Sequence, residues 1–115
     1  MNSRVFIIGD CLKHDISAAA EYGEFVNLLS IRQFGVWSKE YSANLALELK
    51  AAKFDPKKDF LLSVGYTAAL MISAGVIWSN YGPFKALMYY PPSSKYVSFT
   101  VGDSVRHDHA SPNAV

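Results

Sequence analysis

Short apolar runs alternate with amphipathic segments along this chain of 115 residues. Val5–Ile8 is a continuous apolar run rich in β-branched residues, which is typical of a strand buried on both faces. Ile16–Tyr22 contains consecutive alanines and stops before Gly23, so it predicts a short helix with Asp15 as its N-terminal cap. Phe25–Ile31 has the length and hydrophobicity of a second strand. The chain therefore begins with a strand, a brief helix and another strand.

An amphipathic pattern follows over Lys39–Lys53. Tyr41, Leu45 and Leu49 recur at helical spacing, and charged residues lie among them. Ser38 comes directly before the first turn, where serine is a favoured cap. We expect this helix to cover a sheet in an aqueous protein.

The stretch between Asp59 and Lys85 carries no charge. On hydropathy alone it could be a transmembrane helix, which needs about 20 apolar residues. The turn-forming sequence Gly65-Tyr66-Thr67 instead divides it into a strand over Phe60–Val64 and a helix over Thr67–Asn80. A helix of that length spans about 21 Å, which is too short for a bilayer. Because this helix is apolar nearly all round, we expect both its sides to be covered, by the domain or by a partner subunit.

The last patterned segments predict a hairpin. Phe84–Tyr90 has the composition of a strand, Pro91–Ser94 that of a turn, and Lys95–Val101 alternates with a period of two. Such a short connection requires antiparallel pairing, so the final strand should form a sheet edge. From Gly102 onward the sequence is polar and unpatterned.

The order of these elements predicts a three-layer α/β domain with a mainly parallel sheet of four to five strands. We expect a Rossmann-like or flavodoxin-like strand order, 2-1-3-4, followed by the C-terminal antiparallel β-hairpin. We assign residues 1–102 to this single α/β domain and residues 103–115 to a polar, flexible C-terminal tail.

Composition narrows the classes of function. The formal net charge of +1 argues against a protein that recruits nucleic acid or an anionic membrane. The single cysteine, Cys11, excludes an internal disulfide framework and fits a reducing compartment. The N-terminal apolar run Val5–Ile8 is too short for a signal peptide. We expect a cytoplasmic protein with no nucleic-acid or membrane partner.

Candidate chemistry falls on two loops. In an open parallel sheet, ligands bind beyond the carboxyl ends of the strands, where the strand order reverses. The two loops expected there lead into helix N-termini, which attract anions. Their candidate ligand-binding residues are Gly9, Asp10, Cys11, His14, Asp15, Gly65, Tyr66 and Thr67. Neither loop carries a GxGxxG or GxxxxGK pattern, so we expect no cofactor. The alternative is that Asp15 and Thr67 only cap their helices.

Three further features could carry chemistry. Cys11 lies near a helix N-terminus beside Lys13 and His14, which would favour a nucleophilic thiolate. His14 beside Asp15 could act as a general base or a metal ligand. The alternatives are an inert cysteine at a strand end and an ordinary loop histidine, since adjacent side chains seldom point at one atom. His107-Asp108-His109 has the residue types of a metal site but no third ligand at useful spacing, so we expect no metal.

The hairpin is rich in tyrosine. Tyr89, Tyr90 and Tyr96 could stack on a base or nucleoside. The alternative is that these rings only cover the sheet.

The segment HDISAAAEYGEFVNLL, residues His14–Leu29, resembles a pattern of small bacteriophage-encoded α/β proteins of uncharacterised function. In those proteins a first strand is followed by His-Asp, a short helix, and Tyr-Gly-Glu leading into the second strand. The resemblance extends over most of residues 4–101. It includes the segment Asp55–Asp59 that precedes an apolar strand, the apolar helix, and the hairpin Leu87–Val101. It implies a viral origin and a compact fold, and it transfers no activity and no catalytic residue.

Within this segment a structural explanation suffices. Asp15 caps the helix, Gly23 ends it with a positive φ, and Tyr22 packs under the sheet. In the functional alternative His14 and Glu24 reach a ligand, but they lie at opposite ends of the short helix.

Three hypotheses of function follow. The first is a non-enzymatic phage protein that binds a small anionic, nucleotide-like ligand or a host factor in the host cytoplasm. The second is a homo-oligomeric structural or interaction module, which associates through the helix 67–80 or the hairpin edge. The third is a small enzyme that uses Cys11 or His14.

Overall fold

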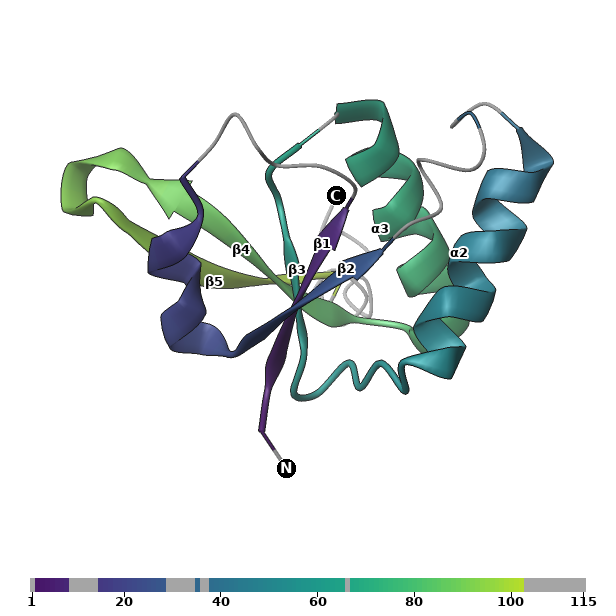
Figure 1. The fold of residues 1–115 in the computed structure, drawn as a ribbon, viewed down its shortest axis with the longest axis horizontal. Helices are drawn as coiled ribbons and strands as arrows, with labels where there is room; N and C mark the ends of the chain where they lie inside the picture. Colours follow the sequence, from purple (N-terminus) through teal and green to yellow (C-terminus); the bar gives the residue numbers. More distant parts are fainter. Residues whose placement is uncertain (1, 9–14, 29–34, 36–37, 66, 103–115) are drawn as a thin grey trace, which may run out of the picture.

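The computed structural model describes residues 2–8, 15–28, 35, 38–65 and 67–102. The elements are β1 Arg4–Ile8, the 3₁₀ helix η1 Ser17–Tyr22, β2 Glu24–Leu28, α2 Lys39–Ala51, β3 Phe60–Leu62, α3 Thr67–Tyr81, β4 Phe84–Tyr90, the 3₁₀ turn η2 Pro91–Ser93, and β5 Lys95–Val101. Figure 1 shows these elements around one sheet. The predicted sequence of alternating strands and helices is confirmed.

The sheet is mixed and has the strand order β2-β1-β3-β4-β5. β1 pairs in parallel with β2 on one side and with β3 on the other, and β3 pairs in parallel with β4. β5 pairs antiparallel with β4 from Phe84↔Val101 to Tyr90↔Lys95. The prediction of a mainly parallel sheet with an antiparallel C-terminal hairpin is therefore confirmed. The strand order reverses between β1 and β3, because β2 lies on one side of β1 and the later strands lie on the other.

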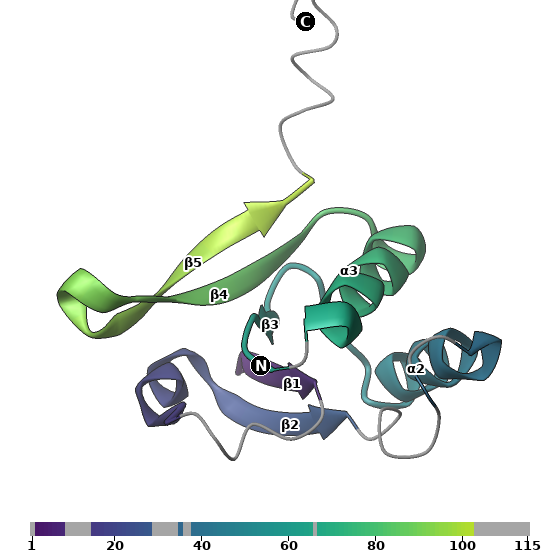
Figure 2. The same ribbon diagram turned by 90° about the horizontal axis from the view of Figure 1, so that it is seen from above.

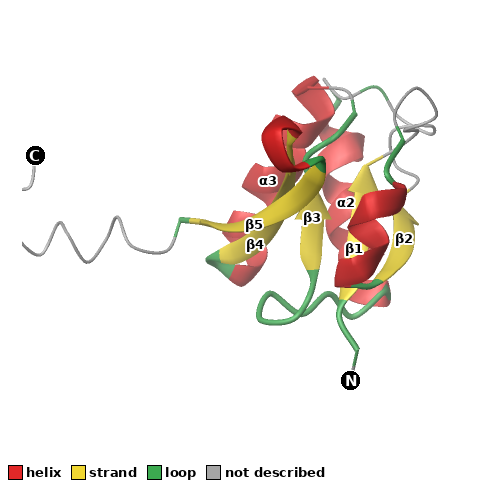
Figure 3. Cartoon of the chain, turned by 90° about the vertical axis from the view of Figure 1, so that its left-hand side faces the viewer, coloured by secondary structure: helices red, strands yellow, loops and turns green. Residues whose placement is uncertain are grey.

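Helices cover both faces of the sheet, as Figures 2 and 3 show. Phe6 and Ile8 of β1 pack in the core under α2 and α3, whereas Val5 and Ile7 pack in a second core against η1. This alternation follows the period of two along a strand. It explains why β1 is apolar at successive positions, since both its faces are buried.

Local sequence accounts for the start of α2 and for the end of η1. The Ser38 hydroxyl accepts a hydrogen bond from the Tyr41 N–H, so Ser38 caps α2 as predicted. Gly23 ends η1 with φ of 152°. A Cβ at Gly23 would collide with the Ser3 carbonyl, so only glycine fits between η1 and the start of β1.

Several boundaries differ from the sequence predictions. The predicted helix Ile16–Tyr22 is a six-residue 3₁₀ helix, because a segment this short cannot recover the cost of nucleating an α-helix. The predicted end of α2 at Lys53 is too late, since Lys53 has a left-handed φ of 58°. The second strand begins at Glu24, and the end predicted for it lies outside the described residues. β3 is shorter than predicted and stops at Leu62.

The uncharged stretch after Asp59 forms a strand and a separate helix, as predicted. Phe60–Leu62 lies inside the sheet and Thr67–Tyr81 packs on one face of it. Across the part of the chain that the structure describes, no helix has the length and hydrophobicity needed to cross a bilayer. Met71 and Trp78 of α3 remain exposed, so the helix is covered on one side only within the described chain.

Candidate functional site

A cavity of about 550 Å³ lies just past the end of β3 and beside the hairpin, on the face that η1 covers. The residues that line it come from the start of η1, from the end of β3 and from the hairpin: Asp15, Ser17, Ala18, Val64, Tyr89, Ser94 and Tyr96. Figure 1 shows the hairpin turn beside the start of η1 at the upper left. The cavity therefore lies at the carboxyl edge of the parallel strands, and among the described candidate ligand-binding residues Asp15 lines it.

Asp15 is the one formally charged side chain among the described residues of this lining. Its carboxylate accepts hydrogen bonds from the Ser17 hydroxyl at 2.7 Å and from the Ser17 N–H at 3.0 Å. These two bonds lower the pKa of Asp15 below its ordinary value of 3.8, the hydroxyl contributing most. Asp15 thus stays ionised near neutral pH, in a fixed orientation.

Asp15 also caps η1, though not at the position predicted. The N-terminal cap of η1 is Ile16, which makes no side-chain hydrogen bond, and Asp15 reaches past it to Ser17. This contact is an Asx-type turn, in which a carboxylate bonds the backbone N–H two residues on.

Two tyrosines form the hairpin wall of the cavity. The rings of Tyr89 and Tyr96 meet edge to face, with centroids 5.4 Å apart. Tyr96 is buried, and its carbonyl accepts a hydrogen bond of 2.8 Å from the Tyr22 hydroxyl. The Tyr22 ring packs against Phe60 under the sheet, so the predicted structural role of Tyr22 is confirmed. Tyr89 leaves an aromatic surface exposed at the cavity.

The structure describes only part of the predicted ligand-binding set. Gly65 has a positive φ of 127°, and Thr67 is the exposed first residue of α3. Neither lines the cavity, so the second loop contributes Val64 instead. The remaining candidates lie outside the described residues: Gly9, Asp10, Cys11, His14 and Tyr66.

Metal ligands do not cluster in the described ranges. No group of three or more His, Cys, Asp or Glu side chains there could hold a metal ion. His107-Asp108-His109 lies outside those ranges.

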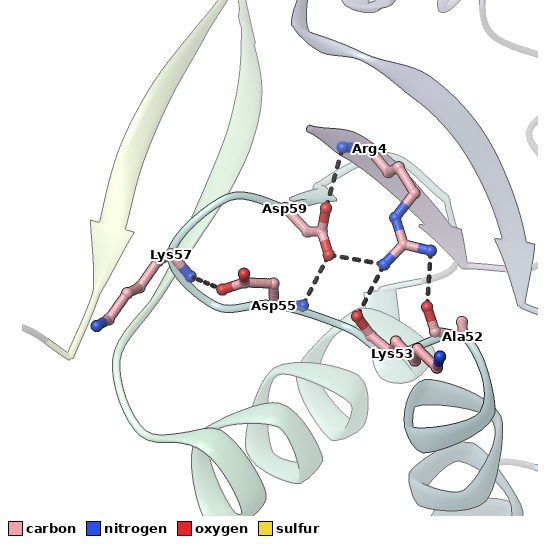
Figure 4. Close-up of polar contacts among 6 residues, drawn as sticks. All are labelled: Arg4, Ala52, Lys53, Asp55, Lys57 and Asp59. Carbon is pink, nitrogen blue, oxygen red and sulfur yellow. Dashed lines mark hydrogen bonds and ion pairs between the residues drawn. The ribbon is translucent and has the colours of Figure 1, made fainter. Parts of the chain in front are cut away.

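The opposite edge of the sheet carries a buried ion pair that the sequence predictions missed. Asp59 is 1 % exposed, and its carboxylate contacts the Arg4 guanidinium at 3.0 Å. The same carboxylate accepts hydrogen bonds from the Arg4 N–H at 3.0 Å and from the Asp55 N–H at 2.7 Å. Figure 4 shows these contacts converging on Asp59.

Arg4 completes this network at the end of α2. Its guanidinium donates hydrogen bonds to the carbonyls of Ala52 at 2.7 Å and Lys53 at 2.9 Å (Figure 4). A cation there satisfies unpaired carbonyls and complements the helix dipole. The network joins β1, the end of α2 and the start of β3, and every contact of Asp59 is internal to the chain. We therefore regard it as structural. Its sequence signal is an ionic residue directly before each of two apolar runs, Val5–Ile8 and Phe60–Leu62.

A comparison with protein families matches residues 3–102 to a family described as Phage Pam3 gp32-like protein. The chain belongs to this family. The match extends from the residue before β1 to the residue after β5, and so includes the cavity and the ion-pair network. No curated protein and no solved structure matches the chain.

Membership in the Phage Pam3 gp32-like family supports a phage protein of uncharacterised function, as the resemblance implied. The particular motif that carried the resemblance, with His14 at its start, is not tested by this match.

Proposed function

We propose that this phage protein is a small-molecule binding protein that acts in the host cytoplasm and takes a nucleoside-like ligand in the cavity beside Tyr89. The proposal adopts the Rossmann-like or flavodoxin-like comparison made above for the strand order, with the ligand beyond the carboxyl ends of the parallel strands. One observation carries it. Asp15 and Tyr89, from segments far apart in the sequence, line one cavity at that edge.

The size of the cavity supports a small ligand. Its volume of about 550 Å³ lies within the range of about 300–1,000 Å³ typical of small-molecule sites. A nucleoside or nucleotide would fill such a space, whereas a folded macromolecule would not enter it.

The chemistry of the lining favours a base and a sugar. The exposed ring of Tyr89 offers a surface on which a planar base can stack, and base–aromatic stacking contributes about 1–3 kcal/mol per base. The carboxylate of Asp15 can accept hydrogen bonds from sugar hydroxyls, as acidic residues do in dinucleotide-binding folds. Ser94 adds a hydroxyl at the same wall.

The charge of Asp15 also sets the orientation of an anionic ligand. An ionised carboxylate repels a phosphate placed next to it. We therefore place the base and the sugar against the described lining, and any phosphate on the side away from Asp15.

Thermal shift measurements over a panel of nucleosides, nucleotides and cyclic nucleotides test the proposal. A binding ligand present at about 100 times its dissociation constant should raise the melting temperature by about 10 °C. Tyr89→Ala and Asp15→Asn should each weaken or abolish the shift. If no member of the panel raises the melting temperature, the proposal is wrong.

The neighbouring Tyr90 provides a matched control. Tyr89 and Tyr90 are 43 % and 46 % exposed, and they lie on opposite faces of β4, so only Tyr89 lines the cavity. Tyr90→Ala should leave the thermal shift unchanged. An equal loss in both variants would show that the ligand binds elsewhere on the hairpin.

A further inference from the structure

The cavity lined by Asp15 and Tyr89 has a negative charge and no positive charge among its described residues. At the start of η1 the Ser17 N–H, which a bound anion could otherwise use, donates to the Asp15 carboxylate at 3.0 Å. The Ser17 hydroxyl donates to the same oxygen at 2.7 Å. Both donors of this wall are therefore occupied, and the charge that they orient is negative. Such a lining disfavours an anion and favours a ligand that brings positive charge.

One oxygen of the Asp15 carboxylate receives both of these internal hydrogen bonds. Oδ1 accepts from the N–H and from the hydroxyl of Ser17, and within the described part of the chain no hydrogen bond involves Oδ2. The hydroxyl and the N–H of Ser17 hold the pKa of Asp15 below its ordinary value, so the carboxylate is ionised near neutral pH. Asp15 therefore offers a ligand a negative charge and an oxygen that can accept hydrogen bonds.

The Tyr89 ring is a second group that favours positive charge. Its edge-to-face contact with Tyr96, with 63° between the ring planes, can cover at most one of its two faces. Tyr96 is buried and is paired with Tyr89 across the hairpin, so it holds that ring at a defined angle. The face of an aromatic ring attracts a cation that lies within about 6 Å of its centroid. A flat cation stacked on Tyr89 therefore gains more than a neutral ring of the same shape.

The two groups can act on one ligand, because they line the same cavity. Charge attraction does not require contact, so Asp15 can accept a hydrogen bond from a sugar hydroxyl and still favour positive charge on the base. Lys85 lies on the same face of β4 as Tyr89, but its ammonium lies over the Phe60 ring at 4.8 Å from the centroid, and Lys85 does not line the cavity. Its charge is therefore used elsewhere.

We propose that the cavity selects a nucleoside whose base is positively charged, such as an N-methylated purine, and that Asp15 determines this preference. The inference rests on the proposed function and names the class of its ligand. Tyr89 stacks on the base, and the Asp15 carboxylate supplies the opposite charge. A nucleoside should also bind more tightly than its phosphorylated form, because a phosphate has a charge of the same sign as Asp15.

Isothermal titration calorimetry with matched ligands tests the charge preference. At mildly acidic pH the base of N7-methylguanosine is positively charged, and guanosine is its neutral parent. The isostere with carbon in place of the methylated nitrogen keeps the methyl group without the charge. The charged ligand should bind about tenfold more tightly than either neutral one, as expected for a cation–aromatic contact combined with an exposed ion pair. Added salt should weaken the preference, because an exposed carboxylate is screened.

Variants assign the preference to its residues. Asp15→Asn keeps an oxygen that can accept the Ser17 hydrogen bonds but removes the charge, so the preference should fall to about twofold to threefold. Tyr89→Leu should also reduce it, whereas Tyr89→Phe, which keeps the ring, should retain it. The ratio of the two affinities is measured within each variant, so a change in folding stability does not alter the comparison.

The outcomes separate this inference from the proposed function. If guanosine and N7-methylguanosine bind equally and Tyr89→Ala abolishes the binding of both, the charge preference is wrong and the proposed function stands. If no nucleoside of the set binds, both are wrong. A preference that Asp15→Asn leaves unchanged would overturn the role of Asp15.

Discussion

Individual side chains join parts of this chain that are far apart in sequence. Asp59 receives hydrogen bonds from Arg4, 55 residues away, and Arg4 in turn binds the carbonyls of Ala52 and Lys53 just past α2. The hydroxyl of Tyr41 on α2 meets the hydroxyl of Ser73 on α3 at 3.2 Å in the buried core. No buried side-chain polar atom in the described residues lacks a hydrogen-bond partner. These satisfied groups help to specify how the helices dock on the sheet.

Asp59→Ala should strongly destabilise the protein. The substitution leaves Arg4 and the Asp55 N–H without their acceptor, and breaking a buried ion pair costs about 3–5 kcal/mol of the free energy of unfolding. Urea denaturation monitored by circular dichroism measures this loss. Asp55→Asn is the control, because the Asp55 carboxylate accepts an exposed hydrogen bond of 2.9 Å from the Lys57 N–H (Figure 4) and is not part of the ion pair. Equal losses in the two variants would contradict the central role of Asp59.

Among the secondary structure elements, α3 combines a buried stripe with an open face. Its buried residues Ala69, Ser73 and Ile77 recur at helical spacing against the sheet. Gly75 lies in the middle of the helix on the side away from the sheet, where a Cβ would meet nothing within 4 Å. Packing within the described chain therefore does not require a glycine there.

Gly75→Ala should stabilise the protein by about 0.5–1 kcal/mol, because alanine restricts the unfolded chain and favours helix. Gly82 is a matched control. A Cβ there also meets nothing within 4 Å, but its φ of 81° disfavours any residue with a side chain. Gly82→Ala should therefore destabilise the protein. Thermal unfolding of both variants checks the opposite signs, and a loss of stability in Gly75→Ala would indicate that another chain occupies this face.

In the molecule as a whole, stability should be highest at the centre of the sheet and lowest at the hairpin. β1 has a strand on each side and a packed core on each face. β5 has a partner strand on one side, and the outer part of its hairpin extends beyond α2 and α3 (Figure 2). Local opening follows such differences in contact and burial.

Native-state hydrogen exchange should show this gradient. The amides of Val5–Ile8 should exchange only on global unfolding. The amide of Ser98 should exchange rapidly, because Ser98 pairs with Leu87, whose carbonyl faces β3, and so does not bond β4. Faster exchange in β1 than in β5 would contradict the arrangement of the two cores.

Much of the architecture could be predicted from particular residues. The run Val5–Ile8 indicated a strand covered on both faces, and the spacing of Tyr41, Leu45 and Leu49 indicated the buried stripe of α2. The bounds predicted for β4 and β5 agree with the structure. Such patterns are local, because strand and helix periods dictate which neighbours share a face.

The candidate site could be predicted only in outline. The sequence predicted that Asp15 lies at a ligand-binding edge of the sheet. It did not show that Tyr89 and Ser94 line the same cavity. It also left Arg4 and Asp59 unconnected. Contacts over such separations depend on strand order and on the twist of the hairpin, which no local period encodes.

The sequence by itself therefore determined the elements, their order and the apolar faces, because these follow from side-chain periodicity and turn chemistry. Tertiary structure alone decided that the hairpin lies beside η1 to close a cavity, and that Arg4 neutralises Asp59. It also decided that β5 is the last strand of the described sheet. The physical reason is that pairing and packing bring together groups whose sequence separation carries no information about their distance.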